Sequence, residues 1–172
     1  MTSPETFDVE LTDDFPATVA QLFAAWTDGS VLQQWWGPVG FTCPIAEMDV
    51  RVGGVSIVAM RAPDEFGGAE FVNSWTYTRV EPDVRLEFES RFVDPDRRPI
   101  SPAEAGIPLA VPAVVPHVLT FRPTDHGGSR LAVTEVGHPD EATRDQSAAG
   151  MAQCLARLQQ LLRGRSRPIA DR

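Results

Sequence analysis

Two side chains on strand-like segments, His117 and Glu135, are the best candidates for proton chemistry in this sequence. Imidazole changes charge near neutral pH, and a buried carboxylate needs a partner to stay ionised, so either group could move a proton inside a cavity. The ordinary alternatives are a structural histidine with satisfied hydrogen bonds and an exposed glutamate at the end of a strand. The sequence alone leaves these alternatives open and assigns no catalytic residue.

The other residues that could ligate a metal or act as nucleophiles do not form a recognisable motif. His117, His126 and His138 lack the spacing of a metal site, because none stands four residues from another ligand. The chain contains no Gly-x-Ser-x-Gly, no phosphate-binding loop and no His-Glu-x-x-His. Cys43 and Cys154 are isolated and are expected to be buried, reduced thiols, with a disulfide or a reactive nucleophile as alternatives. We therefore expect neither a metal nor a cofactor.

Two arginines could hold a negatively charged group at the mouth of a pocket. Arg51 follows an acid in Asp49-Val50-Arg51, and Arg61 ends a strand-like segment. A guanidinium can clamp a carboxylate with two parallel hydrogen bonds. The alternative for Arg51 is a structural ion pair or turn contact, and for Arg61 a solvated position on the strand.

Aromatic residues supply the large apolar surfaces from which a ligand pocket is built. Trp26, Trp35 and Trp36 lie on helical segments and are expected to pack in the core or on the floor of a cavity. Alternation along segment 69–80 places one set of side chains on a single face, namely Phe71, Asn73, Trp75, Tyr77 and Arg79. We expect this aromatic face to point inward, with Asn73 as a polar contact, although the opposite face is not excluded by the pattern.

Charge excludes several classes of partner. The chain has 24 acidic and 15 basic residues, a formal net charge of −9, and every basic residue is arginine. An acidic surface repels nucleic acid and anionic lipid, and the absence of lysine excludes Schiff-base chemistry and the lysine-containing phosphate loop. The acidic N-terminal segment does not resemble a signal peptide, and no window approaches the ~18 apolar residues of a membrane span. A cytoplasmic location is therefore expected.

The hydrophobic period predicts one domain over residues 1–172 in which strands and helices are segregated. A strand at 5–11 precedes a helix at 16–26 and a short helix that Asp28 can cap and that runs through Trp36. Strands are expected at 41–50, 55–61, 69–80, 84–92, 114–122 and 130–136, followed by a helix at 141–163 and a frayed tail at 164–172. The last helix carries one apolar stripe, Met151, Leu155, Leu158 and Leu162. It is the only element long enough to cover one face of the antiparallel sheet, so the fold class is α+β.

A proline-rich insertion at 93–112 separates the fifth and sixth expected strands. It contains Pro95, Pro99, Pro102, Pro108 and Pro112. Proline at this density is incompatible with a central strand or a long helix, so the segment is predicted to form a loop or lid.

Several motifs resemble those of one family. They are Trp26 followed by Leu32-x-x-Trp35-Trp36-Gly37-Pro38, then Phe41-Thr42, Asp49-x-Arg51-x-Gly53-Gly54, Val80-Glu81-Pro82-x-x-Arg85-Leu86-x-Phe88, Ser129-Arg130-Leu131-x-Val133-Thr134 and Gly150-Met151-x-x-x-Leu155-x-x-Leu158. Over residues 6–163 the chain resembles the proteins named for the activator of the Hsp90 ATPase homologue (AHSA-like), a branch of the SRPBCC, START-like, Bet v-like superfamily. Two departures are Met151, where the family usually has an aromatic residue, and the long 93–112 segment.

The resemblance implies a helix-grip fold, in which a curved sheet of six or seven strands wraps a long C-terminal helix around a ligand cavity. The function that it favours is binding of a small apolar or amphipathic molecule. The alternatives are an enzyme similar to polyketide cyclases, aromatases or hydrolases and a co-chaperone-type protein-interaction module, and a homodimer is possible. The residues expected to contact a ligand are Trp36, Phe41, Arg51, Arg61, Phe71, Asn73, Trp75, Tyr77, His117, Glu135, Met151 and Leu155.

Overall fold

The protein is built on one antiparallel sheet in a computed structural model, which describes residues 2–166. Seven strands follow the order β1-β7-β6-β5-β4-β3-β2, and every neighbouring pair is antiparallel. Their bounds are β1 Phe7–Phe15, β2 Thr42–Glu47, β3 Val55–Arg61, β4 Glu70–Glu81, β5 Arg85–Phe92, β6 Val115–Pro123 and β7 Ser129–His138.

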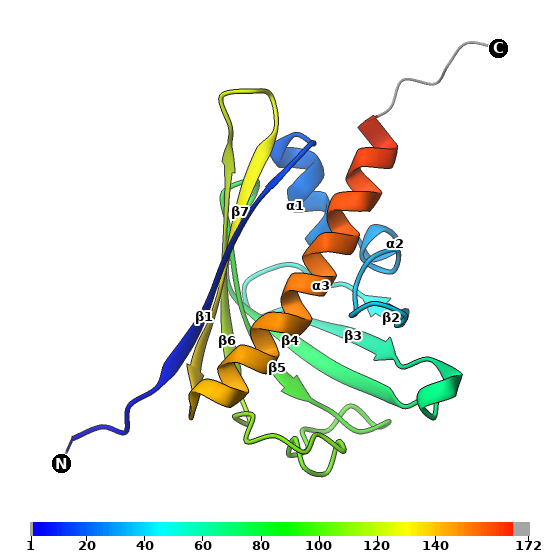
Figure 1. Cartoon of the computed structure of the whole chain (residues 1–172), viewed down its shortest axis with the longest axis vertical. Helices are drawn as coiled ribbons and strands as arrows, with labels where there is room; N and C mark the ends of the chain where they lie inside the picture. Colours follow the sequence, from blue (N-terminus) through cyan, green and yellow to red (C-terminus); the bar gives the residue numbers. More distant parts are fainter. Residues whose placement is uncertain (1, 167–172) are drawn as a thin grey trace.

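Helices cover one face of this sheet. The long helix α3 (Glu141–Ser166) crosses the sheet diagonally, while α1 (Val19–Thr27) and α2 (Gly29–Leu32) flank its C-terminal half (Figure 1). A short 3-10 turn, η1 (Asp64–Phe66), links β3 to β4. The predicted α+β class and the helix-grip arrangement are confirmed. None of the helices between residues 2 and 166 combines the length and apolar character needed to span a membrane.

Strand alternation and register determine which side chains meet inside the sheet. On β6, Val115, His117, Leu119 and Phe121 are buried, and the residues between them are more exposed. Register places His117 opposite Glu135 on β7 and opposite Phe88 on β5. Because directly paired residues share a face of the sheet, these three side chains form a row on the inner surface.

The element ends differ from the sequence expectations by a few residues. Helix α1 begins at Val19, and not near Pro16, because the Thr18 side chain accepts a hydrogen bond from the Gln21 backbone N–H (3.1 Å) while the Gln21 side chain accepts from Thr18 N–H (2.9 Å). Strand β1 starts two residues later than predicted and runs further, to Phe15, and β2 is shorter than predicted. Asp28 caps α2 as expected.

Four tryptophans form the centre of the core. The Trp26 ring meets Trp35 edge-on at 4.9 Å, and Trp36 meets Trp75 edge-on at 5.1 Å. The Trp35 indole N–H donates to the Ala25 carbonyl at 3.0 Å, which satisfies its buried polar atom. Edge-to-face contacts are the favoured geometry for aromatic pairs, so the cluster ties both short helices to the sheet.

The proline-rich segment has no regular structure and lies below the N-terminal half of α3 (Figure 1). An isolated bridge joins Val93 to Pro99, and Ser101 and Glu104 cap each other through reciprocal backbone hydrogen bonds. Arg97 pairs with Glu47 of β2 at 2.5 Å. The frayed tail was predicted to begin at residue 164, but α3 continues to Ser166, and the remaining residues 167–172 lie outside the described part.

Candidate functional site

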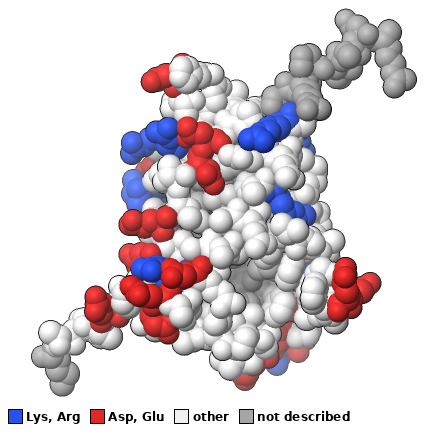
Figure 2. All heavy atoms as spheres, in the orientation of Figure 1, with Lys and Arg blue, Asp and Glu red and all other residues white. Residues whose placement is uncertain are grey.

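A cavity of about 300 Å³ lies between the sheet, the N-terminal half of α3 and the proline-rich segment. The five inner strands, β3 to β7, supply its sheet wall, and Trp36 and Pro38 close one side. The sheet residues are Met60, Asn73, Trp75, Ser90, Arg91, Phe92, Val115, His117, Glu135 and His138. Figure 2 shows this face of the molecule hollowed beside α3, in an area without charged side chains.

Helix α3 supplies the opposite wall at helical spacing. Its contributing residues repeat every three or four positions, as one face of a helix does: Thr143, Gln146, Ser147, Gly150, Met151 and Cys154. This face is polar at its N-terminal end and apolar toward Met151. The polarity of the cavity wall therefore decreases along α3 from Thr143 toward Met151.

The end of the proline-rich segment forms a third, apolar wall. It contributes Ile107, Leu109, Val111, Pro112 and Ala113. Ile107, Leu109 and Val111 are half-buried, and Pro108 and Ala110 between them are exposed. Every second side chain of this stretch therefore faces the cavity.

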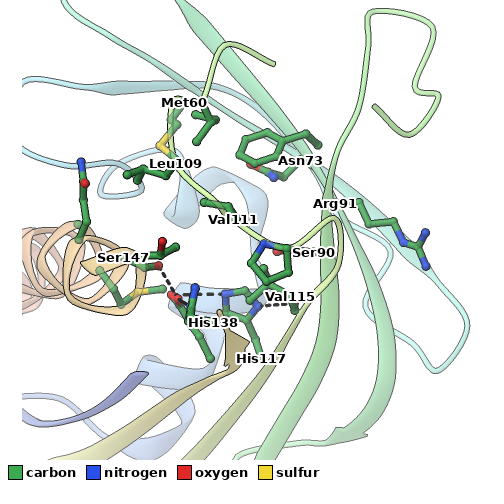
Figure 3. A pocket seen from close by; sticks show the side chains of 18 of the residues that line it. Met60, Asn73, Ser90, Arg91, Leu109, Val111, Val115, His117, His138 and Ser147 are labelled. Carbon is green, nitrogen blue, oxygen red and sulfur yellow. Dashed lines mark hydrogen bonds and ion pairs between the residues drawn. The ribbon is translucent and has the colours of Figure 1, made fainter. Parts of the chain in front are cut away.

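One end of the cavity carries a polar cluster of four side chains, His117, Glu135, His138 and Ser147 (Figure 3). Ser147 Oγ donates to Glu135 Oε2 at 2.5 Å, and His138 Nε2 lies 3.1 Å from the same oxygen. His117 Nε2 lies 3.6 Å from the other oxygen, Oε1. The histidines and the glutamate are almost completely buried.

The partners of Glu135 decide its protonation. Burial by itself raises the pKa of a carboxyl group, because it penalises the charged form. His117 beside the carboxylate, together with the hydrogen bonds from His138 and Ser147, outweighs burial and holds the pKa of Glu135 well below its ordinary value. Glu135 is therefore an ionised carboxylate inside the cavity.

Aromatic packing fixes the ring of His117. The imidazole stacks on Phe88 with centroids 4.7 Å apart and an interplanar angle of 10°, and Phe88 stacks on Trp75 at 4.5 Å. His117 Nδ1 lies 3.0 Å from the Val115 carbonyl oxygen. The ring is thus held from its face and from one nitrogen.

Half of the residues expected to contact a ligand lie on the cavity wall. They are Trp36, Asn73, Trp75, His117, Glu135 and Met151. The aromatic face of β4 points inward as expected, but a register shift after Tyr77 leaves Arg79 exposed and paired with Glu81.

Both candidate arginines lie away from the cavity. Arg51 is exposed and donates from Nε to Asp49 Oδ1 at 2.8 Å, which is the turn contact that the sequence offered as the alternative. Arg61 is also exposed and donates from Nη2 to Asp64 Oδ1 at 2.8 Å. Each guanidinium has a nearby carboxylate within three residues, so neither is positioned to bind an anionic ligand in the cavity.

The remaining candidates belong to the core or to the cavity's surroundings. Leu155 is completely buried among core residues, and Tyr77 is buried with its hydroxyl 2.8 Å from Ser56 Oγ. Phe71 is half-buried near the start of β4, opposite Met60, and Met60 is the one that lines the cavity. Phe41 is half-buried, and its backbone N–H closes a turn onto Pro38.

Several cavity residues were not expected from the sequence, and some of them had a signal that could have found them. Ser147 lies one turn before Met151, so extending the helical stripe toward the N-terminus finds it. The stretch Ile107-Pro108-Leu109-Ala110-Val111 alternates large and small side chains, as a half-buried segment does. The prolines favoured a loop, so this alternation was not used. His138 had no such signal, because its contact with Glu135 depends on the backbone near the end of β7, where Gly137 has a φ of +92°.

The thiols and the polar cluster show no metal-binding arrangement. Cys154 lines the cavity and Cys43 is buried elsewhere, and burial raises the pKa of each thiol to about 11. Both are therefore protonated near neutral pH and are poor nucleophiles. Among residues 2–166, no group of three His, Cys, Asp or Glu side chains is placed to hold a metal ion.

A curved antiparallel sheet, a long C-terminal helix and a cavity between them define a helix-grip protein. Within that class, the sequence profile of the family described as "Activator of Hsp90 ATPase homolog 1-like protein" matches residues 16–163, and the chain belongs to this family, in the SRPBCC superfamily. No curated protein matches the sequence.

Solved structures share the fold at low sequence identity. The AHSA1 protein from Silicibacter pomeroyi is 23% identical with a TM-score of 0.73, over 92% of this chain and 99% of that one. A protein from Chromobacterium violaceum is 24% identical with a TM-score of 0.72, over 90% and 96%. A protein from Arthrobacter aurescens is 21% identical with a TM-score of 0.76, over 95% and 90%. These similarities establish the fold.

Proposed function

We propose that this protein binds a small amphipathic molecule in the cavity between the sheet, α3 and the proline-rich segment. The observation that carries the proposal is a cavity of about 300 Å³ with apolar walls and a buried, hydrogen-bonded polar cluster at one end. Apolar walls with a few fixed polar groups are the usual composition of a small-molecule site. Membership of the family is compatible with this role.

The apolar walls and the polar cluster would contact different parts of the guest. Trp36 and Trp75 offer large apolar surfaces, and Leu109 and Val111 cover the guest from the loop side. The polar cluster would orient one end of the guest, because its geometry is set by neighbours on β5, β6 and α3. The loop would act as a lid, held to β2 through Arg97 and Glu47.

A cavity-filling substitution gives a sharp test. Gly150 lies on the α3 wall, and a Cβ at this position would meet no heavy atom within 4 Å outside its own stretch of the helix. Gly150→Leu should therefore fill part of the cavity without a clash, and it replaces glycine in a helix interior, where glycine costs about 1 kcal/mol. Gly164→Leu is the matched control, because Gly164 is on the same helix, is equally free of neighbours and does not line the cavity.

Binding can be measured through the cavity's own tryptophans. A library of lipids and aromatic metabolites is titrated while tryptophan fluorescence is recorded, and hits are verified by native mass spectrometry. We expect a stoichiometric guest for the natural chain and for the Gly164→Leu control, and at least tenfold weaker binding for Gly150→Leu. A library without any guest, or equal binding by both variants, would contradict the proposal.

An enzyme that uses the same cavity is less well supported by the geometry. A general base works best when its pKa lies near the working pH, and the pKa of Glu135 is displaced downward. The arginines expected to bind an anionic substrate lie elsewhere. A co-chaperone role is suggested by the family's description alone, and stimulation of a chaperone ATPase would be its test. Homodimerisation stays a prediction from the sequence.

A further inference from the structure

Hydrogen bonding fixes the proton position on His117. A carbonyl oxygen can only accept, so the Nδ1 atom that faces Val115 O at 3.0 Å carries a hydrogen. In the neutral imidazole the other nitrogen then carries none. Nε2 of a neutral His117 is therefore a hydrogen-bond acceptor, and it belongs to a residue that lines the cavity.

This acceptor faces a second acceptor. Nε2 lies 3.6 Å from Glu135 Oε1, and only 9% and 5% of the two side chains are exposed. That separation is longer than a direct N–H···O hydrogen bond, which spans about 2.7–3.2 Å. The other carboxylate oxygen, Oε2, already receives hydrogens from Ser147 and His138. Oε1 and His117 Nε2 thus form a pair of acceptors that lacks a donor between them.

The cluster also lacks a balancing cation. His138 donates from Nε2 to Glu135, and its Nδ1 is buried with no hydrogen-bond partner in the described part of the chain, so a second proton there would be a buried donor without an acceptor. Arg91 is the one arginine on the cavity wall of the described residues, and its guanidinium turns away from the cavity toward Glu89, 3.9 Å distant (Figure 3). With a neutral His117, the carboxylate charge of Glu135 is therefore not neutralised at the cavity end.

We propose that the guest carries a protonated amine on an apolar body, and that this ammonium group donates to both Glu135 Oε1 and His117 Nε2. This inference rests on the proposed small-molecule function and deepens it. Two acceptors 3.6 Å apart can both be reached from one nitrogen that stands about 2.9 Å from each. An ammonium group has several hydrogens and a positive charge, so it satisfies both acceptors and neutralises the carboxylate.

The rest of the molecule favours the same class of guest. The apolar body would lie against Trp75, Leu109 and Val111, away from the polar cluster. Tryptophan faces attract cations as well as apolar groups. A net charge of −9 raises the concentration of cations near the surface and lowers that of anions.

Probes that differ only in their head group test the inference. Octylamine, octanol and octanoate share one apolar body and are titrated by calorimetry into the natural chain. We expect octylamine to bind at least about tenfold more tightly than octanol, because hydrogen bonds to charged groups are worth more than neutral ones, and octanoate to bind most weakly. Equal affinities for the amine and the alcohol would overturn the inference. A preference for octanoate would also overturn it, because it would mean that His117 Nε2 carries a hydrogen and donates to Glu135 Oε1 without a guest.

Two variants separate this inference from the function on which it rests. Glu135→Gln should weaken octylamine binding at least about tenfold and leave octanol within about threefold. His117→Phe keeps a ring that can stack on Phe88 but removes the acceptor, so octylamine should again lose affinity and octanol should not; this variant carries the test if Glu135→Gln does not fold. Binding of all three probes that is abolished by Gly150→Leu but does not respond to either variant would retain the cavity as a binding site and reject the amine. Failure of all three probes to bind would reject both proposals.

Discussion

Glu135 shows how little a residue's type determines its chemistry. The sequence allowed an exposed glutamate at a strand end or a buried acid, and these two states differ in ionisation and in use. Its state depends on three contacts from different elements: His117 on β6, His138 at the end of β7 and Ser147 on α3. None of these pairings can be read from local sequence, since they require the strand register and the path of the helix.

The low pKa of Glu135 predicts a pH-dependent stability. A carboxyl group whose folded pKa is lowered stabilises the protein fully above its unfolded pKa of about 4.3, and this stabilisation is lost as the pH falls toward the folded value. We expect Glu135→Gln to lower the free energy of unfolding by about 2 kcal/mol near neutral pH. The difference from the natural chain should shrink as the pH falls below about 4.3.

Urea unfolding of both chains at a series of pH values measures this difference. Glu10→Gln is the matched control, because Glu10 is exposed on neighbouring β1 and its replacement makes the same change in net charge. A stability difference that stayed constant down to about pH 3 would show that the Glu135 carboxylate is not held ionised by its neighbours.

Tyr77 gives a second titration with a clean signal, because it is the only tyrosine in the chain. Burial raises its pKa to about 12, and the hydrogen bond with Ser56 offsets only part of this. The contribution to stability is complete below the unfolded pKa of about 10 and is lost as the pH rises toward the folded value. Phenolate absorbance should therefore appear near pH 12 in the folded protein and near about pH 10 in urea. Coincident titrations in both states would contradict the burial of the ring.

At the scale of elements, the sequence predicted the architecture well and the walls of the cavity only in part. Hydrophobic period identified all seven strands and the long helix, because each element buries a regular stripe. Periodicity cannot tell whether a buried stripe faces other side chains or empty space. Met151 and Leu155 belong to one stripe of α3, yet Met151 lines the cavity and Leu155 is enclosed by the core.

The division of α3 into a cavity half and a core half can be tested directly. Leu155 is fully buried, and Leu155→Ala should lower the free energy of unfolding by about 2–5 kcal/mol through lost packing and a new void. Met151→Ala should cost less, since its side chain already borders an empty volume, and it should alter the affinity for a guest. Chemical denaturation measures both costs, and equal costs would place Met151 in the packed core.

At the scale of the whole molecule, charge is the property that the sequence states most completely. The excess of acids is visible without any structure, and Figure 2 shows acidic side chains and arginines together along one side of the face that it draws, with further acids at its lower edge. The structure adds that many ion pairs of residues 2–166 are exposed at the surface, such as Arg51–Asp49 and Arg97–Glu47. Exposed pairs contribute little to stability, typically less than about 1 kcal/mol each.

The balance between repulsion and surface pairing predicts the response to salt. Salt screens the repulsion among excess acids and also the exposed pairs, but with a net charge of −9 the repulsion outweighs the attraction within the pairs. Raising sodium chloride from about 0.01 M to about 0.3 M should therefore increase the free energy of unfolding, by no more than about 1 kcal/mol. A double variant, Glu5→Gln with Glu65→Gln, removes two exposed acids and should respond less to salt than the natural chain. If salt instead lowered the stability of the natural chain, the surface ion pairs would outweigh the repulsion, and the acidic surface would have to be regarded as a stabilising network.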